Sequence, residues 1–192
     1  GQGMFLKKFF KGSAISKDNE KSEKTVDFSG RAASLLPEME AYGSNLICDN
    51  ICQFHQDTRE IQLFYQTRFY DTDKQLRWSD WGFSGCVLKI KDHRIKGRTF
   101  CYNEKIFQRI IPAGYEKAGK MNDFQIYAPN GEYAQQDLEY ILDWLEKNLC
   151  DMLSYICAVS IREEILEVIF WKPELYPVET VCERIKETLT KK

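Results

Sequence analysis

Two β-rich runs on either side of a polar turn constrain the fold of this chain more than any other feature. The first run is Trp78–Lys91 and the second is Ile95–Tyr102, with the turn Asp92-His93-Arg94 between them. Valine, phenylalanine and tyrosine favour strands, and glycine inside such runs marks a bend or a close backbone approach. The pattern predicts a β-hairpin. It contains no recognisable catalytic motif.

Further strands are predicted on both sides of this hairpin. Over 61–70 every second residue belongs to one face of a strand, namely Ile61, Leu63, Tyr65, Thr67 and Phe69. Segment 46–54 fits either a strand or a short helix, and 124–127 fits a short strand. Segments 155–161 and 165–171 flank a charged turn, and their enrichment in Val and Ile favours a hairpin over a helix.

Two main helices follow from apolar residues at helical spacing. The first covers 132–149, with the apolar stripe Leu138, Ile141, Leu142, Leu145 and Leu149, while Asp137, Glu139, Asp143 and Glu146 face away. The second covers about 177–190 and opens at proline, a residue favoured in the first helical turn; its stripe is Val178, Val181, Cys182, Ile185 and Leu189. Short helices are predicted over 31–42 and 103–112, and a polar loop over 113–122.

Strands followed by segregated helices are typical of α+β proteins. We therefore expect an antiparallel sheet with the two main helices packed on one face. The 192 residues are 43% hydrophobic and 14% aromatic, which is enough for one sizeable core. The expected organisation is a basic amphipathic arm and polar linker over 1–30, followed by a single α+β domain over 31–192.

The charge is uneven along the chain. Residues 1–24 hold six lysines and three acidic residues, which gives this segment a net charge of +3. Since the formal net charge of the whole chain is −2, the remaining residues carry −5. This balance argues against nucleic-acid binding. Within the arm, one helical face is apolar and the other is basic, and the two faces are formed by Phe5, Leu6, Phe9 and Phe10 and by Lys7, Lys8 and Lys11. Such a stretch is a candidate contact with an anionic membrane surface, or a helix that packs on the domain or frays.

The seven cysteines are odd in number and lie mostly in apolar runs. They predict buried free thiols in a reducing, cytoplasmic compartment, with no disulfide and no bound zinc. The sequence has no apolar run long enough to span a membrane. Gly1 is interpreted as the remnant of a tag, so a native segment before Gln2, including a transmembrane one, is left open.

Residues with catalytic or metal-binding chemistry are few. Cys48, Cys52 and His55 have the spacing of a partial zinc site, yet no second tight pair completes it, so core thiols are the preferred interpretation. A Cys–His nucleophilic pair with His55 or His93 is the corresponding catalytic interpretation. Turn or surface positions are predicted for the acidic residues Asp71, Asp73, Glu163 and Glu164. Packing in the core or on the sheet, rather than stacking on a ligand or on bases, is predicted for the aromatic residues Trp78, Trp81, Phe83 and Tyr102. No cofactor motif is present.

Two segments resemble an uncharacterised bacterial family, a domain of unknown function found chiefly in membrane-anchored proteins. Phe83–Leu88 followed by Lys96–Thr99 is similar to its F-x-G segment and later G-x-T. Asn122–Tyr127, with the helix from Glu132, is similar to its F-x-V-Y-S segment and C-terminal helix. The resemblance covers about residues 40–172 and implies no catalytic activity. It departs from the family where Ala128 and its neighbours replace a serine and an aspartate.

The sequence thus favours a non-enzymatic α+β module that binds an unknown protein partner at the cytoplasmic face of a membrane. The alternative is an uncharacterised hydrolase-like enzyme that uses a cysteine or a carboxylate. A deep polar pocket with a thiol, an imidazole and an acid would favour the enzyme, whereas a smooth or apolar surface would favour the binding module.

Overall fold

The computed structural model describes residues 24–31, 44–71, 85–105, 113–171 and 176–190, and these ranges form nine strands and two helices. The helices are α2 (Gln135–Leu153) and α3 (Val178–Thr190). The strands are β1 (Lys24–Arg31), β2 (Ser44–Gln56), β3 (Arg59–Asp71), β4 (Gly85–Lys91), β5 (Arg98–Asn103), β6 (Glu116–Met121), β7 (Phe124–Ala128), β8 (Tyr155–Arg162) and β9 (Ile165–Trp171).

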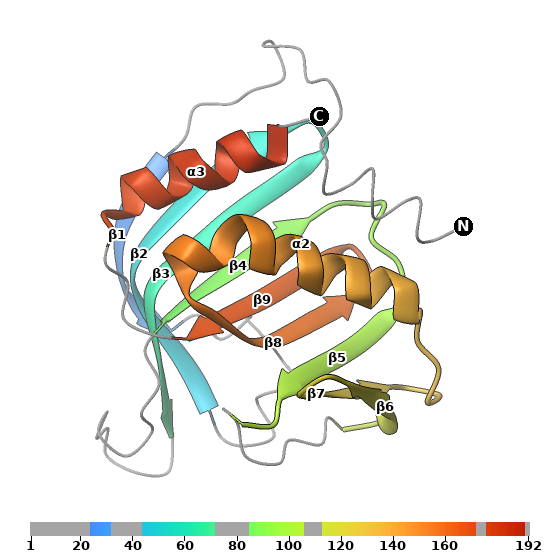
Figure 1. Ribbon diagram of the computed structural model, residues 1–192. Helices are drawn as coiled ribbons and strands as arrows, with labels where there is room; N and C mark the ends of the chain where they lie inside the picture. Colours follow the sequence, from blue (N-terminus) through green and yellow to red (C-terminus); the bar gives the residue numbers. More distant parts are fainter. Residues whose placement is uncertain (1–23, 32–43, 72–84, 106–112, 172–175, 191–192) are drawn as a thin grey trace.

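All nine strands belong to one antiparallel sheet with the order β1-β2-β3-β4-β9-β8-β5-β7-β6 (Figure 1). Strands 61–70, 124–127, 155–161 and 165–171 were predicted, and the ambiguous segment 46–54 is a strand. The α+β class is confirmed, although strands make up more of the molecule than the sequence indicated. None of the helices in the described ranges is long and apolar enough to cross a membrane.

The predicted hairpin of β4 and β5 is wrong. Both runs are strands, but β4 pairs with β3 and β9, and β5 pairs with β8 and β7. The β8–β9 hairpin is inserted between them, and its residues 156–161 and 166–170 are all buried. Neighbouring strands lie about 4.8 Å apart, so β4 and β5 are separated by about 14 Å. The connection 92–97 spans about 20 Å when extended, which suffices to pass over the β8–β9 turn.

Two edge strands occupy segments that the sequence indicated as loop or linker. β1 lies within the predicted linker and pairs with β2, so the linker prediction is wrong from Lys24 on. β6 lies within the predicted polar loop 113–122 and pairs with β7. Three of the six β6 residues are charged, and all but one of the six are exposed or half-buried. An edge strand buries little, so its sequence lacks a strong hydrophobic pattern. The predicted helix 31–42 falls almost wholly outside the described residues, as do most of 103–112, the run 78–84 and the whole arm 5–11.

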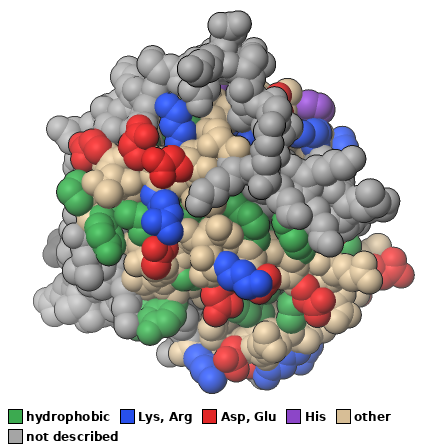
Figure 2. Space-filling model, turned by 45° about the horizontal axis from the view of Figure 1, so that its top comes forward, with side chains coloured by type: hydrophobic (Ala, Val, Ile, Leu, Met, Phe, Trp, Pro, Cys, Tyr) green, Lys and Arg blue, Asp and Glu red, His purple; other side chains and the backbone are tan. Residues whose placement is uncertain are grey.

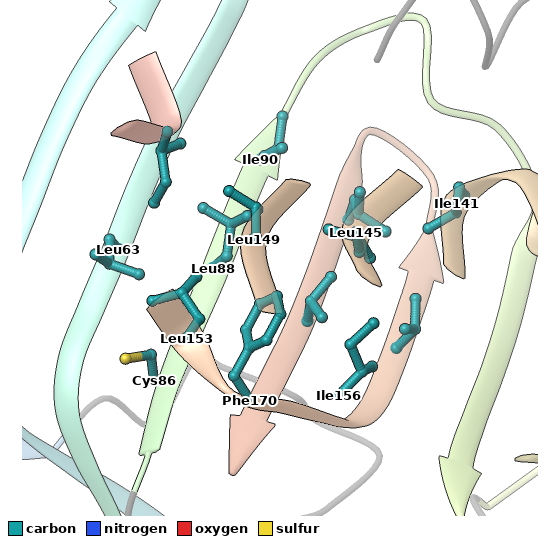
Figure 3. Packing of buried hydrophobic residues seen from close by; sticks show 14 of the residues in the cluster. Leu63, Cys86, Leu88, Ile90, Ile141, Leu145, Leu149, Leu153, Ile156 and Phe170 are labelled. Carbon is teal, nitrogen blue, oxygen red and sulfur yellow. The ribbon is translucent and has the colours of Figure 1, made fainter. Parts of the chain in front are cut away.

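Both helices lie over the same side of the sheet in Figure 1, with α3 above β2 and β3 and α2 across β9 and β8. The predicted apolar stripes of both helices are buried, except Leu142, which is half-buried. In Figure 3, Leu149 and Leu153 of α2 lie next to Leu88 of β4 and Phe170 of β9. A fully buried leucine contributes about 2 kcal/mol by leaving water, so this interface is the main apolar core.

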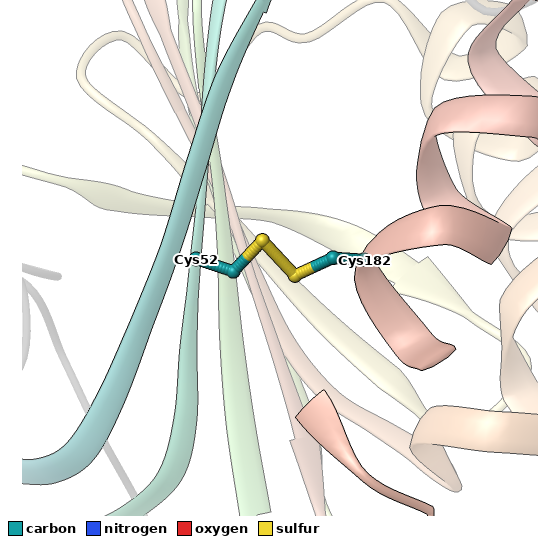
Figure 4. The surroundings of a disulfide bond; sticks show 2 residues. All are labelled: Cys52 and Cys182. Atoms are coloured by element: carbon teal, nitrogen blue, oxygen red, sulfur yellow. A yellow bond between two sulfur atoms is a disulfide. The ribbon is translucent and has the colours of Figure 1, made fainter. Parts of the chain in front are cut away.

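A disulfide joins Cys52 of β2 to Cys182 of α3, two residues 130 positions apart, and both are fully buried (Figure 4). The prediction of seven free thiols is therefore wrong. Both cysteines lie at apolar positions, as the sequence indicated, but the fold brings these two positions face to face. A cross-link over so long a loop removes conformational freedom from the unfolded chain, so it anchors α3 to the sheet.

The carboxyl end of α3 is held by buried side chains of the β2–β3 turn. Arg59 donates from Nη2 to the Leu189 carbonyl at 3.3 Å, and Gln56 donates from Nε2 to the Lys186 carbonyl at 3.0 Å. The Leu189 carbonyl lies in the last turn of α3, where carbonyls lack an intrahelical N–H partner. The Lys186 carbonyl also accepts from Thr190 Oγ1 at 3.0 Å. Arg59 is 1% exposed, and burial is the main cause that lowers the pKa of its guanidinium. Its role is that of a helix cap.

Candidate ligand-binding site

A cavity of about 810 Å³ lies between the β4–β5 connection and the N-terminal half of α2. This volume is in the range of small-molecule and peptide sites. Residues 93–99 form one wall, and residues 130–134 with the first turns of α2 form the other. The floor is apolar and consists of Leu138, Ile141, Ile161 and Leu166. The inserted β8–β9 hairpin therefore creates the site, because the connection that bridges it becomes a wall.

The first wall is fixed by Asp92, which is 2% exposed. Its carboxylate accepts hydrogen bonds from Arg94 N, Nε and Nη2 at 2.8, 2.9 and 2.9 Å, and from Thr58 Oγ1 at 2.5 Å. Burial alone would raise the pKa of Asp92, but the hydrogen bonds from Arg94 and Thr58 bring this pKa below its usual value. The carboxylate is thus a fully used structural anion.

The backbone of the same wall is hydrogen-bonded to the β8–β9 turn. Asp92 N donates to the Glu164 carbonyl at 2.8 Å, Glu164 N donates to the Ile95 carbonyl at 2.8 Å, and Glu163 N donates to the Gly97 carbonyl at 3.0 Å. Gly97 has a φ of +83°, a conformation that other residues adopt at a cost. The wall is therefore pre-formed, as a recognition site requires.

The mouth of the cavity is cationic on this side. Lys96 and Arg98 are exposed, and neither forms an ion pair with another residue of the described ranges. Arg94, in contrast, is turned inward to Asp92 and also lies 3.7 Å from Asp57. His93 is a solvated residue at the rim, with its Nδ1 3.7 Å from Asp92. Two positive charges thus remain available for a ligand.

The second wall holds an unusual carboxylate. Asp137 lies in the first turn of α2 and is 5% exposed, yet its Oδ1 has no hydrogen-bond partner among the described residues. Ala134, at the N-cap position, supplies no side-chain cap. Burial raises the pKa of Asp137. Buried polar atoms without partners are rare in proteins and call for an explanation.

The sequence pattern placed Asp137 on the exposed face of its helix, and that prediction is wrong. Glu139, Asp143 and Glu146 are exposed as expected. Asp137 lies four residues before Ile141 and next to Leu138, so it borders the apolar stripe. This position at the border of the stripe was the signal in the sequence that could have indicated the burial of Asp137. The burial itself depends on the opposite wall, which comes from a distant part of the chain.

The predicted zinc and catalytic residues do not come together. Cys52 is in the disulfide, and His55 lies on the surface with its Nε2 3.4 Å from Glu60. Cys48 is in β2, opposite Thr67. No group of three or more metal-binding side chains occurs in the part of the chain that the structure describes. Glu163 and Glu164 are exposed in the β8–β9 turn, as predicted, and Asp71 ends β3 while Asp73 lies outside the described residues.

The remaining described thiols are poor nucleophiles. Cys86, Cys101 and Cys157 are buried, and Cys150 is half-buried. Burial raises the pKa of Cys101 to about 12 and is the main cause that raises the pKa of Cys150 to about 11; it also raises the pKa of Cys157. A thiol is reactive as the thiolate, so these groups favour packing over covalent chemistry.

Two further features of the fold lack the chemistry of this cavity. A second hollow of about 740 Å³ lies beside β7 and the C-terminal half of α2, and acidic side chains line it, including Glu139, Asp143 and Glu146. On the other face of the sheet, Tyr102 stacks on Tyr127 at 5.9 Å, with both rings buried, so Tyr102 is a packing residue as predicted. Neither feature contains an unpartnered buried atom such as that of Asp137 among the described residues. In Figure 2, acidic and basic side chains are interspersed on the face in view.

Comparisons with known proteins give little further guidance. No family model matches the chain, and no curated protein matches it. Among solved structures, the crystal structure of the mycobacterial trehalose monomycolate transport factor A, TtfA, matches with 9% sequence identity and a TM-score of 0.42, over 85% of this chain and 82% of that chain. A likeness of this size carries no argument about function.

Proposed function

We propose that this chain is a non-enzymatic α+β binding module that contacts a partner protein at the cytoplasmic face of a membrane, with the cavity beside Asp137 as its recognition site. The observation that carries the proposal is Asp137, which lines a pre-formed cavity and whose buried Oδ1 has no hydrogen-bond partner among the described residues. An atom of this kind destabilises the free protein and gains a hydrogen bond only when a donor enters. The two helices pack on one face of the sheet, and α2 supplies one wall of the cavity.

The construction of the cavity supports binding rather than chemistry. The hydrogen bonds of Asp92 hold one wall in place, the raised pKa values of the described free thiols disfavour nucleophilic attack, and Lys96 and Arg98 offer unused charges at the mouth. A rigid site with a few polar groups above an apolar floor is typical of recognition.

Site-specific photocrosslinking in living cells tests the contact with a partner protein. A photoreactive amino acid replaces Thr99, which lines the cavity and is half-buried. We expect a discrete protein adduct in the membrane fraction that disappears on Lys96→Glu with Arg98→Glu. The same probe at the exposed Glu187 of α3 is the matched control, since it lies outside the cavity. An adduct that survives the double charge reversal, or one found only with soluble proteins, would reject the proposal.

The membrane contact is assigned to Phe5, Leu6, Lys7, Lys8, Phe9, Phe10 and Lys11, whose support is the sequence pattern alone. Each lysine near an anionic surface contributes about 1 kcal/mol, and this attraction is screened by salt. The test is co-sedimentation with anionic and neutral vesicles, using the wild type and a variant with Lys7, Lys8 and Lys11 replaced by Glu. Equal pelleting with both kinds of vesicle would remove the membrane part of the proposal and leave the partner contact standing.

A carboxylate-using hydrolase is the second candidate, and Asp137 is the observation that favours it. A buried carboxyl group with a raised pKa inside a cavity is typical of catalytic acids. The test is turnover of chromogenic ester, amide and glycoside probes by the wild type and by Asp137→Asn. Turnover that this substitution abolishes, with the fold intact by circular dichroism, would favour the enzyme over the binding module.

A further inference from the structure

The cavity beside Asp137 divides its polar groups between its two walls. The β4–β5 connection carries the unused cations Lys96 and Arg98, while the α2 side carries Glu132 and Asp137. A ligand that satisfies both walls presents an anion to the connection and a hydrogen-bond donor to the helix. The orientation of such a ligand in the cavity is therefore fixed, with its anion toward the β4–β5 connection and its donor toward α2.

The apolar floor lies directly beside the unpartnered acceptor. Leu138 follows Asp137 in the chain, and Ile141 lies one helical turn further on; both are at most 2% exposed. A ligand that reaches this floor must bring a donor close to an apolar group. A polypeptide meets this requirement, because every residue other than proline carries a backbone N–H next to its side chain. An acyl chain brings no donor to that depth and leaves the Asp137 oxygen unsatisfied.

We propose that the cavity recognises a peptide segment of the partner protein in which an acidic residue adjoins an apolar one. The apolar side chain packs on Leu138 and Ile141, the neighbouring N–H donates to Asp137 Oδ1, and the carboxylate pairs with Lys96 and Arg98. This assignment rests on the proposed function and specifies its recognition chemistry. The residues of the cavity act by binding, and no covalent step is involved.

Fluorescence anisotropy with labelled peptides on the full chain tests this assignment. The first series of pentapeptides has a central Leu, Ile or Phe flanked by Glu; a second series has Lys in place of Glu; a third is the Glu series with the central backbone nitrogen methylated. We expect the Glu series to bind at least about tenfold more tightly than the other two, because each comparison removes one charge-assisted or buried hydrogen-bond partner.

Three variants assign the effects to residues. Lys96→Glu with Arg98→Glu reverses the preference between the Glu and Lys series. Asp137→Leu abolishes the difference made by methylation and keeps the charge preference. Lys147→Glu is the control, since Lys147 is exposed on α2 outside the cavity and pairs with Asp143 at 2.9 Å; it changes neither. Circular dichroism and thermal unfolding of each variant confirm the fold.

Equal affinity for the Glu and Lys series, or no binding up to about 1 mM, overturns the peptide assignment. Binding of anionic vesicles that depends on Lys96 and Arg98, without a peptide preference, overturns it in favour of a lipid headgroup. The photocrosslinking experiment separates this failure from failure of the proposed function. A protein adduct at the cavity combined with absent peptide preference rejects only the recognition chemistry, whereas loss of the adduct rejects the function itself.

Discussion

Two buried carboxylates belong to the structure of the cavity, and their surroundings differ: Asp92 holds one wall in place from behind, and Asp137 lines the other wall. Asp92, on the β4–β5 connection, accepts hydrogen bonds from Arg94 and Thr58, and its pKa is lowered. Asp137, in the first turn of α2, leaves Oδ1 unpartnered among the described residues, and its pKa is raised. The carboxylate of Asp92 is fully hydrogen-bonded within the protein, whereas that of Asp137 keeps one acceptor atom without a partner among the described residues.

The difference separates a structural acid from a binding acid. A carboxylate with all its partners in place stabilises the fold and has nothing to offer a ligand. A buried carboxylate without a partner costs stability, and such a cost persists where it serves a function. Substitution of the two residues should therefore change stability in opposite directions.

The largest effect is expected for Asp92→Ala. It removes the acceptor of the Arg94 and Thr58 hydrogen bonds and leaves the Arg94 guanidinium with only its longer contact to Asp57, so we expect a loss of about 4 kcal/mol in the free energy of unfolding. Urea denaturation with an unchanged m-value measures it. Glu60→Ala, which removes an exposed residue that contacts His55 and Lys91, is the control and costs under about 0.5 kcal/mol. If Asp92→Ala also cost less than about 0.5 kcal/mol, Asp92 would not be a structural residue.

The disulfide comes next. Cys52→Ala with Cys182→Ala should lower the free energy of unfolding by about 3 kcal/mol, because the cross-link spans 130 residues. Neither cysteine lines the cavity, so peptide affinity should stay unchanged. Thiol titration of the unfolded, unreduced wild type should count five of the seven cysteines as free. A count of seven would show that the bond is absent in solution.

The third prediction concerns the stability of the protein at acidic pH. The pKa of Asp92 is lower in the folded protein than in the unfolded chain, so its stabilisation is present above the usual aspartate pKa and is lost as the pH falls through the folded value. The wild type should lose stability below about pH 4 more steeply than Asp92→Asn. Arg94, whose pKa is raised mainly by its hydrogen bond to Asp92, keeps its positive charge in this range, so the contrast reports on Asp92. Parallel curves for the two proteins would contradict it.

The smallest effect carries the opposite sign. The pKa of Asp137 is higher in the folded protein, so its contribution is fully present at low pH and is lost as the pH rises through the folded value. Asp137→Asn should therefore raise the free energy of unfolding by about 1 kcal/mol at pH 7 and leave it unchanged at pH 3. Thermal unfolding at both values measures this. A destabilised variant at pH 7 would mean that Asp137 has a structural partner.

The sequence predicted the elements with strong local periodicity. The stripes of α2 and α3, the alternation over 61–70 and the hairpin of β8 and β9 all depend on residues a few positions apart. The class of the fold followed from their order.

The features that were missed depend on distant residues. The β4–β5 hairpin failed because a later hairpin takes both pairing edges, and β6 was missed because an edge strand needs no hydrophobic pattern. The disulfide depends on a contact between positions 52 and 182. The cavity depends on residues 92–97 meeting α2, so Asp137 looked like an ordinary exposed helix residue.

Carboxyl ¹³C NMR of Asp137, titrated with pH in the free protein and in the presence of saturating Glu-series peptide, shows directly whether Asp137 binds the ligand. We expect a pKa above that of an ordinary aspartate in the free protein, because burial disfavours the charged form and Oδ1 has no hydrogen-bond partner among the described residues. We expect a lower pKa in the complex, because a donated hydrogen bond stabilises the charged form. An ordinary pKa in the free protein, or a pKa that the peptide leaves unchanged, would show that Asp137 is not a binding residue.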